Sequence, residues 1–319
     1  AKILYLRAQI YMAKDELTLA QQFFLSSNVI FIKNNNYEEI INTFLNLGKI
    51  TLMLKAYHSA NSYLRQAEKV YLDNSIGNDS LLGEIYYYMA RSYFKTEDIG
   101  KAIDYSFLAK SKFEQVHNRE EYAKTLLLIS EEYNKKGDLT NAIKYSQKTL
   151  EVYKELDELN NISEIENNLG KLFYEFENIE ESFKHYEISK DIRMRRKDYK
   201  IVDTLINICE NYIKLKNISK CEEVLEEIAS YIEEEDMEKL IDLNILWYRI
   251  YTIKEMTKEA EYILLDTYKL SRTSNLKKKS AQLAIMIGKF YIDNKRDFEA
   301  AKYLDEGVNI FKEIGILKN

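Results

Sequence analysis

The sequence contains no proline, only nine glycines and only two cysteines among its 319 residues. Because proline and glycine are the residues that most disfavour helix interiors, their scarcity favours an all-α fold built from long helices. Two cysteines are too few for a disulfide framework, and they are typical of a reducing compartment. A length prior of roughly 150 residues per domain allows about two domains.

A surplus of positive charge and a long apolar run are also missing. The 46 lysines and arginines are outnumbered by 52 acidic residues, which disfavours a domain that grips nucleic acid by itself. The longest apolar stretch, FFLSSNVIFI at 23–32, is about half of the roughly 20 residues that a membrane helix needs. Since no signal peptide opens the chain, we expect a cytoplasmic protein with no membrane contact. The helical pattern is already under way at Ala1, so we expect the natural N-terminus to lie upstream.

Motifs for catalysis and metal binding are missing too. His58, His117 and His185 stand far apart, without Cys or His at ligand spacing, so we expect no metal site. The chain has no G-x-x-x-x-G-K phosphate loop, and no Ser or Cys has a recognisable base-bearing context. We therefore expect a protein that is not an enzyme and uses no cofactor.

What the sequence does contain is a repeat. In YYYMARSYFKTEDIGKAIDYSFLAK (86–110), Ala90 precedes Tyr93 by three residues and Ala102 by twelve. The pattern returns along the whole chain with a period of about 40 residues. The first position of the eight copies, small in all but one, is held by Ala8, Gly48, Ala90, Ser130, Gly170, Cys209, Tyr248 and Gly288. The second position, small in all eight, is held by Ala20, Ala60, Ala102, Ala142, Ser182, Cys221, Ala260 and Ala300.

Helix packing explains this spacing. Two antiparallel helices approach to about 8 Å only where the facing side chains are small. Each copy is therefore predicted to be a helix-turn-helix unit, and since one hairpin cannot bury its apolar faces, the units must stack into a solenoid. We expect a single domain over 1–319, with units starting near 1, 41, 83, 123, 163, 202, 241 and 281. Cys209 and Cys221 hold both small positions of one unit, where we expect them to fill space as thiols.

The repeat resembles the tetratricopeptide repeat. The order of small residue, tyrosine and then alanine is that of this family, and the segments at 87–110 and 167–189 are close to its consensus. The period of about 40 rather than 34, and the missing proline and early tryptophan, depart from it. The resemblance implies a right-handed superhelical solenoid.

Longer units of this kind are similar to those of the RRNPP group, the peptide-pheromone receptors of Gram-positive bacteria. The richness in Asn, Ile, Lys and Tyr fits an AT-rich genome of that sort. The resemblance implies a quorum-sensing transcriptional regulator: a homodimer that binds a short linear signalling peptide, changes its superhelical pitch, and contacts DNA only through a helix-turn-helix upstream of this sequence. Two alternatives stay open, namely a generic tetratricopeptide scaffold for protein partners, and a Rap-type phosphatase or anti-activator.

A polar stripe indicates where a peptide would bind. If the first small residue is position 8 of each unit, positions 2, 6, 9 and 13 lie on the opposite side of the first helix, toward the concave surface. An asparagine at position 6 can donate to and accept from a peptide backbone, and a cation at position 9 can meet a carboxylate. Apolar residues on the stripe offer side-chain pockets. The predicted peptide-binding residues are Asn46, Lys49, Tyr88, Arg91, Lys124, Leu128, Asn168, Lys171, Asn207, Leu246 and Arg249.

Overall fold

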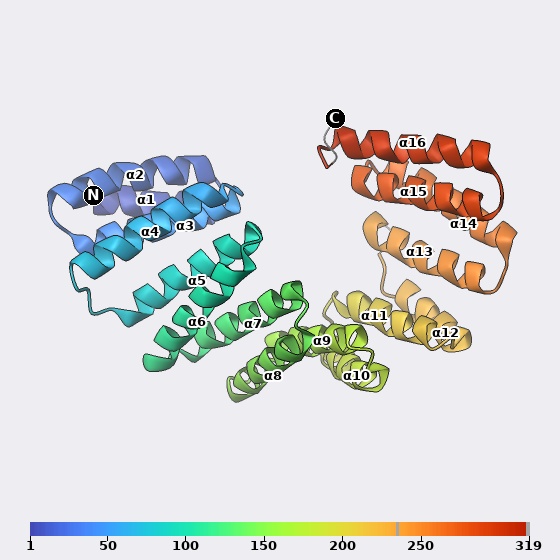
Figure 1. Cartoon of the computed structure of the whole chain (residues 1–319), viewed down its shortest axis with the longest axis horizontal. Helices are drawn as coiled ribbons and strands as arrows, with labels where there is room; N and C mark the ends of the chain where they lie inside the picture. The colour runs from blue at the N-terminus through green and yellow to red at the C-terminus, as the bar shows by residue number, and fades with distance from the viewer. Residues whose placement is uncertain (234–235, 317–319) are drawn as a thin grey trace. The chain divides into compact units, whose positions relative to one another are not determined.

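The computed structural model describes residues 1–233 and 236–316, which form helices and turns without a strand. Sixteen helices follow one another through this part of the chain (Figure 1). Their bounds are α1 (Lys2–Ala13), α2 (Leu17–Lys33), α3 (Tyr37–Met53), α4 (Tyr57–Asp73), α5 (Asp79–Lys95), α6 (Ile99–Gln115), α7 (Arg119–Lys136), α8 (Leu139–Glu155), α9 (Leu159–Glu175), α10 (Ile179–Arg196), α11 (Ile201–Lys214), α12 (Ile218–Ala229), α13 (Met237–Ile253), α14 (Thr257–Thr273), α15 (Lys277–Asp293) and α16 (Asp297–Glu313). Among the described residues, no helix has the length and apolar character needed to span a bilayer.

The chain forms two compact units, Ala1–Asn178 and Ile179–Asn319. The first unit contains α1 to α9, and its helices pack as the pairs α1 with α2, α3 with α4, α5 with α6, and α7 with α8. The second unit contains α10 to α16, with the pairs α11 with α12, α13 with α14, and α15 with α16. Short turns join the two helices of each pair, so the predicted all-α fold of helical hairpins is confirmed.

The small residues lie where the two helices of a hairpin meet. Ala90 and Ala102 have no exposed surface. A Cβ atom added to Gly48 would lie 2.7 Å from the side chain of Leu64, and one added to Gly288 would lie 2.6 Å from that of Leu304. A larger residue at these positions would therefore force the two helices apart, as the spacing predicted.

Aromatic rings stack between the two helices of several hairpins, three residues after the small positions. The rings of Tyr93 on α5 and Tyr105 on α6 are stacked at 5.4 Å, and those of Tyr133 on α7 and Tyr145 on α8 at 5.6 Å. The sequence identified the first tyrosine of each pair but not its partner on the second helix. These pairs contribute to the packing beyond their buried area.

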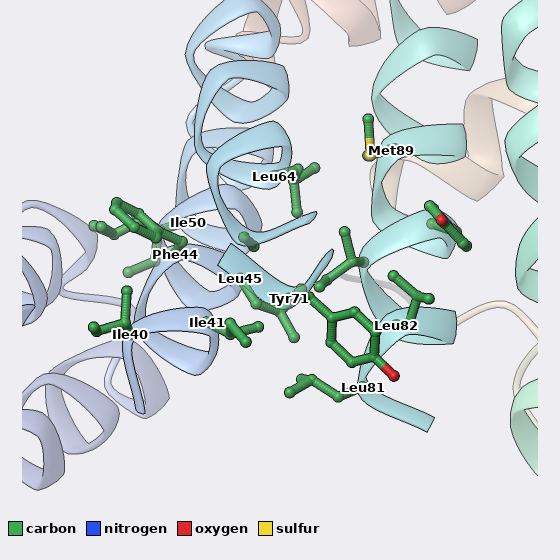
Figure 2. Close-up of a cluster of buried hydrophobic side chains, with 14 of the residues drawn as sticks. Ile40, Ile41, Phe44, Leu45, Ile50, Leu64, Tyr71, Leu81, Leu82 and Met89 are labelled. Atoms are coloured by element: carbon green, nitrogen blue, oxygen red, sulfur yellow. The ribbon is translucent and has the colours of Figure 1, made fainter. Parts of the chain in front are cut away.

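The first three hairpins of the first unit, α1 to α6, share one apolar core. Figure 2 shows the part of it that lies between α3, α4 and α5. Its buried side chains include Ile41, Phe44 and Leu45 of α3, Leu64 and Tyr71 of α4, and Leu81, Leu82 and Met89 of α5. Since α4 packs against both α3 and α5, each hairpin is covered by the next one, which is the stacking that a solenoid requires.

Cys209 and Cys221 correct one expectation. They do meet inside the α11–α12 hairpin and are fully buried, but they are joined in a disulfide rather than held as two thiols. The reason is geometric. Two facing small positions bring the Cα atoms to 5.0 Å, within the range of about 4.4–6.8 Å that a disulfide spans.

The turns share a left-handed residue. Within residues 1–233 and 236–316, thirteen residues other than glycine have a positive φ, and each lies just after the end of a helix, as Glu255 does with φ 59°. Gly137, with φ 83°, is the glycine that occupies this place between α7 and α8. Backbone bonds hold the bend, for example from the amide of Glu255 to the carbonyl of Thr252 at 3.1 Å. A side chain with a Cβ is strained in this conformation by about 1 kcal/mol or more.

Replacing Glu255 with glycine is therefore expected to raise the free energy of unfolding by about 0.5–1 kcal/mol, because glycine adopts a positive φ without strain. Replacing Gly137 with alanine is expected to lower it by about 1 kcal/mol for the same reason. Urea denaturation measures both changes. The control is Glu255→Ala, which removes the carboxylate but keeps the Cβ, and an equal gain in this variant would contradict the argument.

Candidate functional site

The predicted stripe lies on the odd-numbered helices, the first of each hairpin. In the first unit α3 packs against α5, and α5 packs against α7, in addition to their hairpin partners. Stripe residues of successive first helices are therefore neighbours, although about 40 residues separate them in the sequence. A ligand lying across these helices would contact several hairpins at once.

A pocket of about 340 Å³ lies between α3 and α5 and contains three of the predicted residues, Lys49, Tyr88 and Arg91. The ammonium group of Lys49 lies 4.7 Å from the centre of the Tyr88 ring, and the guanidinium of Arg91 lies 5.6 Å from it. Two cations thus flank one aromatic face, an arrangement that favours aromatic and anionic groups. The full lining is Met12, Lys49, Leu52, Met53, Lys55, Tyr57, Tyr88, Arg91 and Lys95.

This α3/α5 pocket is strongly positive in a chain whose net charge is −6. Four of the lining residues are Lys or Arg, and none is acidic. Lys49 is paired with Glu84 of α5, whose carboxylate lies 2.8 Å from its ammonium group. Over the described residues, Lys55, Arg91 and Lys95 form no ion pair, so their charge is available to a ligand.

Glu131 on α7 lies near these cations. The surrounding protein desolvates its carboxylate and raises its pKa, while Lys95 and Arg91 lower it in part. Tyr87, beside Tyr88 on α5, has its pKa raised to about 12, chiefly by burial. Desolvation disfavours the charged form of both groups, although the side chains of Glu131, Arg91 and Lys95 are themselves exposed.

A second, smaller pocket of about 150 Å³ involves α7, α8 and α9 and contains Asn168 and Lys171. Its wall also includes Asn134, Glu131 and Glu175, so two amides and both signs of charge are present. Amides can pair with a peptide backbone, and mixed charge suits polar side chains. The stripe of the first unit is therefore basic near α5 and polar near α9.

In the second unit, ion pairs between successive first helices involve several stripe residues. Arg249 on α13 is paired with Glu210 on α11, and Lys279 on α15 is paired with Asp242 on α13. Asn207 lies half-buried on α11. Arg249 is thus held by a carboxylate of its own chain.

Four other predicted residues, namely Leu128, Leu246, Lys124 and Asn46, are buried or already bonded within the protein, so they are less accessible to a ligand than the stripe pattern suggests. Leu128 and Leu246 are only 6% and 3% exposed, because they pack into the interior instead of forming open pockets. Lys124 is bound to Glu120 and Glu121 one turn earlier on its own helix, at 2.7 and 2.9 Å.

Asn46 uses its amide nitrogen within the protein. It donates to the hydroxyl of Tyr5 and to the carbonyl of Asn42, both at 2.9 Å. Only its side-chain oxygen is left for a ligand. Tyr5 belongs to α1, the neighbouring first helix. The repeat pattern of the sequence compares equivalent positions and does not show contacts between helices, so it could not reveal this hydrogen bond.

The pattern also missed part of the pocket lining. Lys55 and Tyr57 come from the turn between α3 and α4 and from the start of α4, outside the stripe. Met12 belongs to α1, the preceding first helix. A sequence signal was present for Lys55, which follows Met53, the last stripe position of its unit, by two residues.

Comparison with known proteins shows the fold. No model of a known protein family matches the sequence, and no curated protein sequence matches it either. Solved structures do match. The apo form of the quorum sensor NprR from B. thuringiensis is 15% identical with a TM-score of 0.69, over 97% of this chain and 86% of NprR.

Two further structures extend the likeness. The tetratricopeptide-repeat STAND protein PH0952 from Pyrococcus horikoshii is 14% identical with a TM-score of 0.72, over 98% of this chain and 47% of that protein. The Rap conjugation gene regulator of plasmid pLS20, in complex with the Phr* peptide, is 15% identical with a TM-score of 0.54, over 88% of this chain and 76% of the regulator. At such identities the likeness establishes a tetratricopeptide-like solenoid fold.

Proposed function

We propose that this chain is a peptide-binding sensor domain, which binds a short linear signalling peptide across the first helices of successive hairpins. The observation that carries the proposal is the α3/α5 pocket, in which Lys49, Tyr88 and Arg91 come together from two hairpins. Its size suits one large side chain, and its charge suits a carboxylate. The complex of a Rap regulator with the Phr* peptide supports it, since that protein shares the fold.

The charge of the pocket defines the part of the peptide that binds there. Arg91 and Lys95 form no ion pair among the described residues, although the carboxylate of Glu131 lies near them, so a terminal carboxylate or an acidic side chain can pair with them. Tyr88, Leu52 and Met53 offer apolar contact to the side chain that carries or precedes it. The amides near α9 then take the peptide backbone.

In the proposed mechanism, peptide binding changes the relative populations of conformations that differ in the curvature of the helical stack. A peptide that contacts α3, α5 and α9 ties successive hairpins together and so favours one curvature of the stack over others. The equilibrium between the two curvatures shifts by a free energy equal to the difference in the peptide's binding free energy for them. We further propose that this shift regulates transcription in the cytoplasm through a homodimer. The structural likeness to the quorum sensor NprR supports this regulatory role.

Selection from a library of random hexapeptides, followed by calorimetry with the selected peptide, tests the proposal. Arg91→Gln combined with Lys95→Gln is expected to weaken binding at least about tenfold, since each lost charge-assisted hydrogen bond is worth about 1.5–3 kcal/mol. The matched control is Lys148→Gln, which removes an exposed lysine on α8 and should leave the affinity unchanged.

A further variant tests the asparagine of α9. Asn168→Ala is expected to weaken the same peptide, because it removes a side chain that pairs with a peptide backbone. Unchanged affinity in this variant would remove Asn168 from the site. Failure to select any peptide would overturn the sensor proposal and would favour a scaffold for folded partners.

A further inference from the structure

A larger pocket, of about 540 Å³, lies on α4 and shares no residue with the α3/α5 pocket. Six of its seven lining residues come from α4, and the seventh, Tyr93, comes from α5. The lining is polar throughout: His58, Asn61, Ser62, Arg65, Gln66, Lys69 and Tyr93. We call it the α4 pocket.

The α4 pocket is basic. Arg65 and Lys69 are exposed and, over the described residues, form no ion pair, and no lining residue is acidic. The guanidinium of Arg65 donates to the hydroxyl oxygen of Tyr93 at 2.6 Å. Glu68 is the nearby carboxylate. It attracts Arg65 but is hydrogen-bonded to Tyr86, outside the pocket lining.

Asn61 is the unusual residue in this pocket. Its side-chain oxygen is buried and has no hydrogen-bond partner among the described residues. A buried polar atom without a partner costs about 1–3 kcal/mol. Since a carboxamide can turn over, Asn61 can offer either a donor or an acceptor to a ligand.

The second unit contains a related arrangement with a carboxylate in place, although its arginine comes from another position of the repeat: Arg296 directly precedes α16, whereas Arg65 lies within α4. Glu261 on α14 occupies the position of Asn61, directly after the small residue of the second helix, and Tyr291 on α15 occupies that of Tyr93. There the Tyr291 hydroxyl donates to the Glu261 carboxylate at 3.0 Å. The guanidinium of Arg296 donates to the same oxygen at 2.7 Å. The chain thus shows how a carboxylate is held between a tyrosine and an arginine at this point of the repeat.

We propose that the α4 pocket binds a carboxylate ligand, held between Arg65 and Tyr93 as the Glu261 carboxylate is held between Arg296 and Tyr291. Because Tyr93 accepts a hydrogen bond from Arg65, its own hydroxyl proton is available to donate to the ligand. The remaining N–H groups of Arg65 and the ammonium group of Lys69 supply charge. Asn61 pairs with a second polar group next to the carboxylate.

The carboxylate has two possible sources, a small dicarboxylate or the side chain of Asp or Glu on a partner protein. Titrations with succinate and with the blocked peptide acetyl-Gly-Glu-Gly-amide distinguish them, observed through the Nε–H resonance of Arg65 in the full chain. Binding of either probe supports the proposal and identifies the source. Succinamide and the corresponding glutamine peptide are the neutral controls, and an equal response to them would overturn it.

The decisive variant is Asn61→Glu, which supplies the missing carboxylate from within the chain, as Glu261 does. It is expected to raise the melting temperature and to weaken succinate or glutamate-peptide binding at least tenfold. Asn61→Gln is the matched control and should keep the binding. If neither probe shifts the Arg65 resonance in the wild-type protein, or if Asn61→Glu responds as the wild type does, the proposal is wrong. The hexapeptide affinity at the α3/α5 pocket is expected to stay unchanged, which separates this test from that of the sensor function.

Discussion

Replacing Glu132 with glutamine is expected to remove a loss of stability that the wild-type protein undergoes as the pH rises from about 5 to about 8. Glu132 lies on α7 with no exposed surface. One of its carboxyl oxygens accepts a hydrogen bond from the Ser106 hydroxyl of α6 at 2.8 Å, and the other has no partner among the described residues. Burial raises the pKa of this carboxyl to about 8, against the lowering effect of Ser106.

The direction of the effect follows from proton binding. The unfolded chain loses the Glu132 proton near pH 4.5, whereas the folded protein keeps it until about pH 8. The stabilisation is therefore complete below pH 4.5 and is lost as the pH rises through 8. The slope is about 1.4 kcal/mol per pH unit, which gives a total on the order of 3–5 kcal/mol.

Urea denaturation between pH 5 and 9 measures the effect as the difference between wild type and Glu132→Gln. Taking the difference removes the contribution of the three histidines, which titrate in the same range. Ser106→Ala is the companion variant. Since the Ser106 hydrogen bond lowers the Glu132 pKa, its removal should extend the decline to higher pH. Parallel pH profiles for wild type and Glu132→Gln would show that Glu132 is not protonated at neutral pH.

Replacing both Cys209 and Cys221 with alanine is expected to lower the free energy of unfolding of the second unit by about 2–3 kcal/mol. The disulfide joins α11 to α12 across a separation of 12 residues, and cross-links of this span stabilise mainly by restricting the unfolded chain. Most other hairpins have alanine at the position of Cys221, and Ala8 and Ala90 occupy the position of Cys209 in theirs, so the variant should fold. The loss should therefore reflect the missing cross-link and not misplaced helices.

Thermal unfolding with and without dithiothreitol checks this expectation. Reduced wild-type protein should melt at the temperature of the alanine variant, and the variant itself should not respond to dithiothreitol. A thiol assay of the unreduced, unfolded protein gives an independent readout. Two free thiols in protein that had been exposed to air would contradict the disulfide.

The hairpin fold could be predicted from the sequence because its determinants are local. Gly48, Ala60 and their equivalents recur at fixed spacing, and the clash that a Cβ at Gly48 would make with Leu64 is the physical reason for that spacing. The disulfide could not be predicted from the same pattern. A cysteine and an alanine fill a small position equally well, and only the 5.0 Å distance between the Cα atoms distinguishes a bond from a contact.

The candidate site was predictable only in part, because periodicity shows which side of a helix a residue faces but not which residues of neighbouring helices it contacts. Periodicity placed Lys49, Tyr88 and Arg91 on one side of their helices, and the α3/α5 pocket contains all three. It did not show that Leu128 is buried, because burial there depends on how closely the neighbouring helices approach. Nor did it show the bond from Asn46 to Tyr5, which joins residues 41 positions apart.

The pairing of Lys49 with Glu84 gives the α3/α5 pocket an internal competitor. A ligand carboxylate that only displaces Glu84 replaces one ion pair of Lys49 with another. Its net binding free energy is therefore small, because the displaced Glu84 carboxylate must be solvated again. A ligand that also reaches Arg91 and Lys95 would meet two cations that form no ion pair among the described residues, with Glu131 as a more distant carboxylate. If the pocket binds a peptide as proposed, it would discriminate by the length of the ligand as well as by charge, and small anions such as chloride and acetate would be poor substitutes.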